Sequence, residues 1–213
     1  MTETQRDWNQ NYLDADTPWD SGGPSPHLEE LLTRHAIAPG RALEIGCGSG
    51  NNALLLARLG FTVTAVDVAP HAIELARQKA REAGLEIDFR VADLLQSGCG
   101  REIAGGEPFP FVFDRGVYHC LRRDGVGPFL ENLRDLIAAG GIYALLAGNA
   151  NDPCEREIGP PQVHAHELTA ELDPLFELIE LRECRFHGLP IETPDGEEVL
   201  PLAWLAVLRR RAS

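Results

Sequence analysis

Three glycines within a seven-residue run are the strongest chemical signal in the chain. The run from Glu44 to Gly50 reads E-I-G-C-G-S-G and lies between a short apolar stretch and a helical pattern. Glycines at such a turn permit positive φ and let a ligand contact the backbone. A triphosphate site would need the lysine of G-x-x-x-x-G-K, and a dinucleotide site would need a small residue where Asn51 stands. The run therefore fits neither phosphate-binding pattern.

Carboxylates end the strands that are expected after this run. Asp67 ends a β-branched stretch, 21 residues after Gly46. A carboxylate at this place binds ribose hydroxyls in dinucleotide folds, and the alternative role is the N-cap of a helix over 70–83. Asp93 and Asp114 end the next two strands, with a surface turn as the alternative for Asp93. Because ligands bind outside the carboxyl ends of such strands, we expect these acids to lie near the glycines.

The spacing acid-x-G-x-G-x-G, with acids at later strand ends, resembles the cofactor signature of class I S-adenosylmethionine-dependent methyltransferases. The resemblance implies that Glu44 stabilises the ammonium end of S-adenosylmethionine, that Asp67 binds its ribose and that Asp93 faces its adenine amino group. The alternative role of Glu44 is to fix the loop through backbone N–H groups. The cofactor-binding residues that the resemblance implies are Trp19, Glu44, Gly46, Cys47, Gly48, Gly50, Asp67, Val68, Ala92, Asp93, Leu94 and Asp114.

Further segments resemble the thiopurine and tellurite-resistance type of small-molecule methyltransferase and the bacterial heterocycle methyltransferases. Residues 114–116 read D-R-G, as in the thiopurine group, and Trp19 lies in a W-x-x-G-x-P arm before the core. The stretch 159–168 is similar to that group's G-P-P-x-x-V-x-x-x-E-[IL] segment, although Val163 comes one residue early. This resemblance covers nearly the whole chain and implies a small-molecule methyl acceptor.

Two residues beside the expected acceptor are candidates for catalysis. Arg115 would stabilise an incoming anion or assist deprotonation through water, unless it forms a salt bridge with Asp114 or another carboxylate. His119 would act as a general base, with a structural role as the alternative. Trp19 is expected to fold over the cofactor as a lid, with packing on the sheet as the alternative. The reaction is expected to be an in-line displacement, for which the protein mainly supplies alignment and a dry pocket.

Histidine and cysteine patterns favour neither a metal site nor disulfides. His164 and His166, with Glu167 beside them, lie close in sequence. Only one residue separates the two histidines and no further ligand lies nearby, so polarity at a helix N-terminus explains them better than a metal site. The five cysteines are odd in number and include no C-x-x-C pair. We therefore expect no metal and a reducing cytoplasm.

Alternating strand and helix patterns supply the elements that position these residues. Strands are expected over 42–45, 61–66, 86–91, 111–113 and 142–147, mostly with helices between them. This alternation is typical of a parallel sheet covered on both faces. Two further strands, 176–186 and 204–210, follow without an intervening long helix. The expected fold class is α/β, Rossmann-like and doubly wound, with a seven-stranded, mostly parallel sheet and an antiparallel C-terminal strand pair.

Turn and cap residues set the expected boundaries of the helices. Ser25 as N-cap and Pro26 at the first position predict the start of a helix. A helix is expected over 128–138, and the Gly-rich residues 96–108 are expected to form a loop.

Length and charge restrict the partners. The 213 residues are interpreted as a single methyltransferase domain, 1–213, with an N-terminal arm or lid over 1–26 and a core over 27–213. Lys plus Arg total 19 and Asp plus Glu total 33, so the net charge is −14, which argues against nucleic acid and anionic membranes as partners. Neither a membrane span nor a signal peptide is expected from the apolar runs.

The expected function is S-adenosylmethionine-dependent methylation of a small molecule, with S-adenosylhomocysteine as product. The acceptor is expected to be a thiol, a selenol or a heteroaromatic S, O or N atom. A non-catalytic or regulatory cofactor-binding module on the same fold is the first alternative. A nicotinamide-dependent reductase is the second, and the missing third small residue counts against it. The sequence gives no basis for an oligomeric state.

Overall fold

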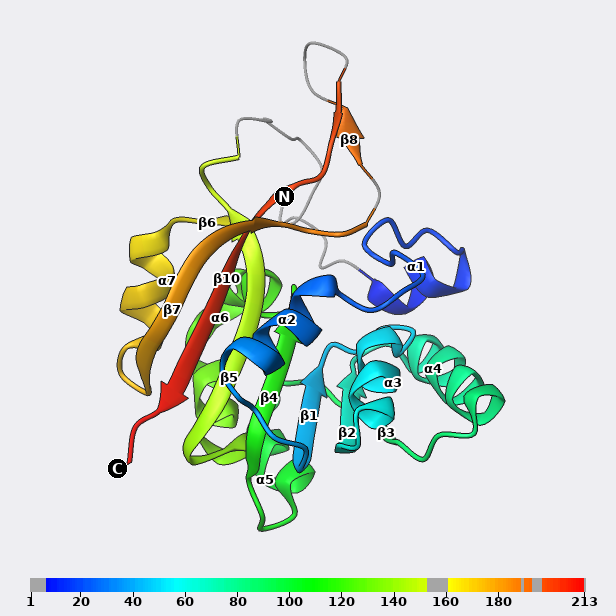
Figure 1. Ribbon diagram of the computed structural model, residues 1–213, viewed down its shortest axis with the longest axis horizontal. Coiled ribbons are helices and arrows are strands. Elements are labelled where there is room, and N and C mark those ends of the chain that lie inside the picture. The colour runs from blue at the N-terminus through cyan, green and yellow to red at the C-terminus, as the bar shows by residue number, and fades with distance from the viewer. Residues whose placement is uncertain (1–6, 153–160, 189, 193–196, 213) are drawn as a thin grey trace.

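One large β-sheet organises the described part of the chain, which in this computed structural model is residues 7–152, 161–188, 190–192 and 197–212 (Figure 1). Its strands are β1 (Arg41–Ile45), β2 (Thr62–Asp67), β3 (Asp88–Val91), β4 (Phe109–Arg115), β5 (Ile137–Asn149), β6 (Gln162–Val163), β7 (Phe176–Arg185) and β10 (Leu202–Arg210). The order is β3-β2-β1-β4-β5-β10-β7, with β6 paired to β5. Two short strands, β8 (Ile191–Glu192) and β9 (Glu198–Val199), pair separately.

The strand directions confirm the expected fold class. From β3 to β5 every neighbouring pair is parallel. The last strand, β10, is antiparallel to both β5 and β7, between which it lies. The antiparallel C-terminal pair therefore extends the parallel part of the sheet rather than forming a separate unit.

Helices cover both faces of the sheet because its strands are apolar on both sides. They are α1 (Trp8–Leu13), α2 (Pro26–Arg34), α3 (Asn51–Arg58), α4 (Pro70–Ala83), α5 (Cys99–Ala104), α6 (Tyr118–Leu136) and α7 (Ala165–Leu172). Buried apolar residues of α2, α3 and α4 form one core with the sheet, and those of α5, α6 and α7 form the other. Among the described helices, none is long and apolar enough to cross a membrane.

The carboxyl ends of the parallel strands meet at the upper edge of the sheet in Figure 1, where α1 lies beside α4. The strand register brings the expected site residues to this edge. Asp114 pairs with Ile45 at the end of β1, and Asp67 pairs with Val91 at the end of β3. The sheet therefore places the glycine run and the strand-end acids on one side of the molecule.

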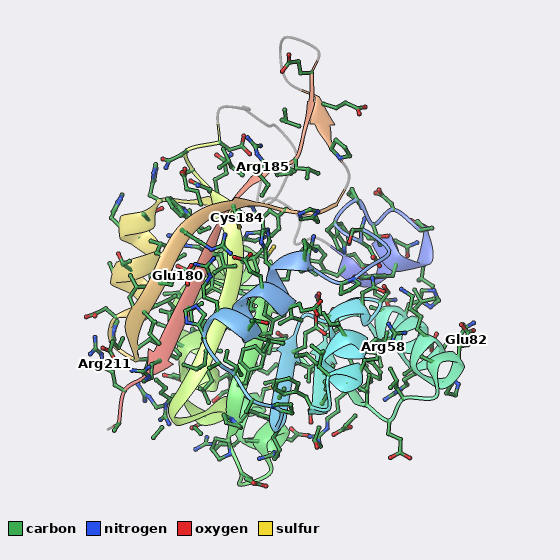
Figure 2. All side chains as sticks on the ribbon, in the orientation of Figure 1. Arg58, Glu82, Glu180, Cys184, Arg185 and Arg211 are labelled. Carbon is green, nitrogen blue, oxygen red and sulfur yellow. The ribbon has the colours of Figure 1, made fainter. Side chains whose placement is uncertain are left out.

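The end of β7 is held near the same edge by contacts with α2. Figure 2 shows Glu180, Cys184 and Arg185 following one another along this strand. The Glu180 carboxylate lies 2.7 Å from Nε2 of His35, and Nε2 of His27 hydrogen-bonds the Arg185 carbonyl at 2.9 Å. These contacts fix where the chain leaves β7, next to the start of α2.

The prediction of a helix over 128–138 was wrong about where the helix begins, and the strand predicted after it was shorter than the observed strand. The helix α6 begins at Tyr118, because the Asp114 carboxylate accepts the first free backbone N–H groups, and it continues through Pro128. The strand β5 begins at Ile137 rather than at 142, and an irregularity in its pairing with β4 accommodates the glycines that had suggested a turn.

The loop expected over 96–108 contains the helix α5, so that expectation was also wrong. Gly100 in this helix packs directly against α6, and a Cβ there would lie 2.4 Å from the backbone oxygen of Asn132. By contrast, the helix start at Ser25 and Pro26 is confirmed, although the Ser25 side chain makes no capping hydrogen bond. Residues 159 and 160 of the G-P-P segment lie outside the described residues.

Candidate active site

The glycine run forms a tight turn between β1 and α3. Gly46 and Gly48 have φ values of +63° and +53°, which L side chains rarely adopt. A Cβ on Gly46 would lie 2.0 Å from the side chain of Val117, and one on Gly48 would lie 2.5 Å from the hydroxyl of Tyr12. Both positions therefore require glycine, and Gly50 follows as the N-cap of α3. Cys47 is buried within the turn.

Glu44 is a buried acid at the end of β1 with one oxygen committed and one available. Its Oε1 accepts a hydrogen bond of 2.9 Å from the Asn52 amide, whose own oxygen accepts from the backbone of Ser25. No described group hydrogen-bonds its Oε2, which is buried. Burial raises the pKa of Glu44 to about 8. A cation beside Oε2 would favour the ionised form, so the binding of an ammonium group by Glu44 stays a prediction.

Asp67 joins the end of β2 to the glycine turn. Its two oxygens accept from the backbone N–H groups of Gly48, at 2.8 Å, and Ala69, at 2.9 Å. Burial raises the pKa of Asp67 despite these hydrogen bonds. Each carboxylate oxygen retains a further lone pair, so this geometry is compatible with accepting two hydroxyl protons.

Exposed apolar side chains lie beside this acid. Val68 is 45% exposed and Val91, at the end of the neighbouring β3, is 51% exposed. Ala92 follows, and its N–H donates to the Asp67 carbonyl at 2.9 Å. Oδ1 of Asp93 accepts from the backbone of Leu95, while Leu94 is buried against the core. A carboxylate flanked by apolar surface suits a nucleoside, whose sugar is polar and whose base is flat and largely apolar.

Asp114 lies at the end of β4 and caps α6. Its carboxylate accepts from the N–H groups of Val117 and Tyr118, at 2.7 and 2.9 Å, and from the Tyr143 hydroxyl at 2.8 Å. Burial raises its pKa to about 6. Its hydrogen bonds orient the helix that carries His119, and its contact with a cofactor stays a prediction.

Arg115 binds two covering segments instead of forming the salt bridge with Asp114 that was considered. Its Nη1 donates to the Trp19 carbonyl at 3.0 Å, and its Nη2 donates to the His187 carbonyl. Its guanidinium carbon lies 5.5 Å from the centre of the Phe186 ring. Arg115 therefore connects the N-terminal arm with the segment that follows β7.

His119 also lies near Phe186, with 6.0 Å between the ring centres. Its Nδ1 accepts a hydrogen bond of 2.7 Å from the N–H of Gly148 at the end of β5. In the neutral ring this places the proton on Nε2. The buried ring is therefore set up as a donor at Nε2, which differs from the general base expected from the sequence. Phe186 itself, which lies near both candidate residues, was not singled out by the sequence.

The N-terminal arm covers the glycine turn through aromatic and polar contacts. Trp19 Nε1 donates to the Tyr12 hydroxyl at 3.1 Å, and the Trp19 ring packs edge-on against Trp8. The next residue, Asp20, accepts from the Ser49 hydroxyl at 2.5 Å and from the Asn51 amide at 2.8 Å. Sequence reasoning found Trp19 but missed Tyr12 as a loop contact and Asp20 as an anchor.

Lys79 extends this anchor to α4, and the histidine pair lies elsewhere. Lys79 Nζ donates to the Ser49 hydroxyl at 2.6 Å. His164 is the N-cap of α7 in a capping box with Glu167, as helix polarity had suggested. Within the ranges that the structure describes, no three His, Cys, Asp or Glu side chains are grouped to hold a metal.

Comparison with known proteins identifies the family. A methyltransferase domain family matches residues 42–141. A 2-heptyl-1-hydroxyquinolin-4(1H)-one methyltransferase of Mycobacteroides abscessus is 41% identical over 188 residues, which are 86% of this chain and 79% of that relative. The chain belongs to the S-adenosylmethionine-dependent methyltransferases.

Other methyltransferase relatives match over shorter stretches. A ubiquinone biosynthesis O-methyltransferase of Xanthomonas euvesicatoria is 40% identical over 81 residues, and the alignment spans about a third of each chain, 34%. Among solved structures, one from work on the conversion of a disulfide bond into a thioacetal group during echinomycin biosynthesis has a TM-score of 0.75. It shares 28% identity and covers 91% of this methyltransferase and 85% of that chain.

TehB from Haemophilus influenzae shares the fold with this methyltransferase. Its TM-score is 0.68 at 22% identity, over 87% of this chain and 62% of TehB. S-adenosylmethionine is the cofactor of the family, and the residues found here fit it. The turn carries glycines that no side chain can replace, Glu44 offers a buried oxygen to a cation, and Asp67 lies beside exposed apolar surface.

Proposed function

We propose that this methyltransferase transfers a methyl group to a heteroatom of a small heteroaromatic compound, with a ring hydroxyl or N-hydroxyl group as the first choice. The similarity to the quinolone methyltransferase carries this proposal, because it extends over 86% of the chain at 41% identity and so includes both halves of the sheet. When bound, S-adenosylmethionine supplies a methyl group that the acceptor heteroatom displaces in line from the sulfonium sulfur.

The cofactor is held by the residues at the ends of β1, β2 and β3. Glu44 takes the ammonium group, Asp67 the ribose hydroxyls and Asp93 the adenine amino group, with Val68 and Ala92 along the base. The glycine turn approaches the cofactor with its backbone, and Trp19 closes over it. The hydrogen bonds of the arm to Ser49 and Asn51 support this covering role, because they hold the arm on the turn.

The acceptor binds over the ends of β4 and β5. Phe186, which lies near Arg115 and His119, gives an aromatic ring a surface to pack against. The positive charge of Arg115 favours the anionic form of an acidic hydroxyl. Such a hydroxyl ionises without a strong base, and its proton passes to solvent, so the commitment of Nδ1 of His119 to Gly148 is compatible with turnover.

The test is a panel of acceptors assayed for S-adenosylhomocysteine release. We expect turnover with 1-hydroxyquinolin-4-ones or related heteroaromatic hydroxyls and weaker turnover with small aliphatic alcohols. Cofactor binding without turnover on any hydroxyl, thiol or amine would support the non-catalytic alternative instead. Absence of cofactor binding in calorimetry would refute the methyltransferase proposal itself.

A sulfur acceptor is the second candidate. The solved structure from the thioacetal work is 28% identical and matches over 91% of this chain, and that work concerns sulfur chemistry. A thiol needs little assistance to ionise, since its ordinary pKa is about 8.5. Heteroaromatic thiols in the same panel distinguish the two candidates: faster turnover than with the matching hydroxyls would favour sulfur.

A further inference from the structure

The buried amide of Asn132, on α6, holds the backbone that follows β3. Its Nδ2 donates to the carbonyls of Leu94, at 2.8 Å, and Gln96, at 2.9 Å, and its Oδ1 accepts from the N–H of Gly100 at 2.8 Å. Only 1% of Asn132 is exposed. One side chain therefore satisfies three backbone groups of a single segment, residues 94–100.

The same segment fixes the carboxylate of Asp93. Oδ1 of Asp93 accepts from the N–H of Leu95 at 2.9 Å, and its carbonyl accepts from the N–H of Gln96 at 3.1 Å. The N–H of Leu95 is in the same peptide unit as the Leu94 carbonyl that Asn132 binds, and the N–H of Gln96 is in the next unit. A displacement of this backbone would thus move Asp93 while leaving Asp67, on β2, in place.

The packing leaves the segment little freedom to settle elsewhere. Gly100 lies so close to α6 that a Cβ would be 2.4 Å from the Asn132 backbone oxygen. Leu94 is buried in the core on the same side of the sheet. Without the amide, the Leu94 carbonyl would be buried without its partner, and such groups are costly unless the backbone shifts to find another.

We propose that Asn132 is a positioning residue that sets the preference of this enzyme for adenine, by holding Asp93 against the amino group of the base. This inference rests on the proposed function, in which Asp93 binds that group. Asn132 acts through the backbone of residues 94–96 and has no contact with the reacting atoms. It would control which base is bound, and it would leave the ribose and methionine contacts unchanged.

The test compares S-adenosylhomocysteine with S-inosylhomocysteine, in which a carbonyl oxygen replaces the adenine amino group and N1 carries a hydrogen. We expect the unaltered enzyme to bind the first roughly tenfold more tightly, the size of one hydrogen bond to a charged group. Asn132→Asp keeps the shape and the acceptor for Gly100 but loses the amide donor, so at pH 8 the affinity ratio should fall close to one. Leu133→Ala, a buried apolar change on the same helix, should lower stability and keep the ratio.

An unchanged ratio in Asn132→Asp would overturn the inference, as would an equal loss of the ratio in Leu133→Ala. A ratio of one in the unaltered enzyme would also overturn it, because Asp93 would then not read the amino group. If neither ligand bound the unaltered enzyme, the proposed function would fail first, and the two failures are therefore distinguishable. If Asn132→Asp does not fold, the affinity ratio of the two ligands is measured in Asn132→Ser instead, which retains one small donor.

Discussion

The cofactor half of the site, at the ends of β1 to β3, differs from the acceptor half, at the ends of β4 and β5, in how far apart its contacts lie in sequence. Asp67 reaches Gly48 and Ala69, 19 and 2 residues away. Arg115 reaches Trp19 and His187, 96 and 72 residues away. The first half is built mainly from successive strand ends, and the second is assembled from three distant segments.

This difference separates two kinds of change. The cofactor half depends on backbone groups and on glycines that no side chain can replace, so most substitutions there are expected to be damaging. The acceptor half depends on side chains and on loops that lie on the surface, where variation is tolerated. Acceptor preference is therefore expected to change more easily than cofactor binding.

The largest effect is expected for Asp67→Ala in the cofactor half. The change removes the acceptor of two backbone N–H groups together with the proposed ribose contact. Since a hydrogen bond to a charged group contributes about 1.5–3 kcal/mol, cofactor affinity should fall by roughly 100-fold or more in calorimetry. Asp88→Ala, at the exposed start of β3, is the control and should bind normally. If cofactor affinity fell by less than threefold in Asp67→Ala, the two halves of the site could not be distinguished in this way.

Arg115→Ala tests the acceptor half. The variant loses the connection between the arm and the segment after β7, so turnover should fall by roughly 10- to 100-fold, the range expected when alignment is lost. Cofactor affinity should change by less than about threefold, because Glu44 and Asp67 retain their own contacts. Arg115→Lys should recover part of the rate, and Arg90→Ala serves as an exposed control. A parallel loss of turnover and affinity would show that the two halves are not separable.

Phe186→Leu should have a smaller and more selective effect. Losing an aromatic contact costs about 0.5–1.5 kcal/mol, so KM for a heteroaromatic acceptor should rise by roughly 3- to 10-fold. A small aliphatic thiol, if it is accepted at all, should show little change. Phe176→Leu, at the opposite end of β7, is the matched control. Equal changes for both acceptors would place Phe186 outside the acceptor surface.

The smallest effect expected is a difference in thermal stability with pH. Burial raises the pKa of Glu44 from 4.5 to about 8, so between these values the folded chain binds more protons than the unfolded chain, and stability falls as the pH rises. Glu44→Gln does not titrate, whereas the shift lowers the stability of the unaltered protein by about 3–4 kcal/mol between pH 5 and pH 8. In the absence of cofactor, the Tm of the variant should therefore rise relative to that of the unaltered protein by roughly 10 °C over this range.

Asp114 provides the comparison from the acceptor half. Its pKa is raised from 3.8 to about 6, so its contribution falls over a lower range, and Asp114→Asn should leave the slope between pH 7 and pH 8 nearly unaltered. Scanning calorimetry across this range measures both variants. A flat profile for the unaltered protein above pH 6 would contradict the assignment to Glu44.

The sequence predicted the cofactor half better than the acceptor half, and the contacts explain why. The glycine turn and Asp67 follow from a short motif and from strand ends, and local geometry brings them together. The connection of Arg115 to Trp19 and His187 depends on how remote segments pack, which no local pattern encodes. Asn132 escaped notice for the same reason, because its three partners lie in residues 94–100, more than 30 positions earlier in the chain.

The wrong boundaries have causes of the same kind. Pro128 is typical of a first helical turn, yet here it lies within α6, because the capping by Asp114 starts the helix ten residues earlier. Gly140 and Gly141 suggested a stop, and the sheet accommodates them as an irregularity of pairing. In both cases tertiary contacts outweighed the preference of single residues.

The position of β10 has a consequence for synthesis. Strands β3 to β5 can pair as soon as residues 41–149 have left the ribosome. The described pairing gives β7 no partner in the large sheet until β10 arrives, and β10 begins 53 residues after the end of β5. At translation rates of ~5–20 residues per second, the nascent chain carries an incomplete sheet edge for several seconds. The strand made last thus closes the acceptor half, and a ribosome stalled before residue 202 would hold a chain with an assembled β3-β2-β1-β4-β5 sheet and an unattached β7.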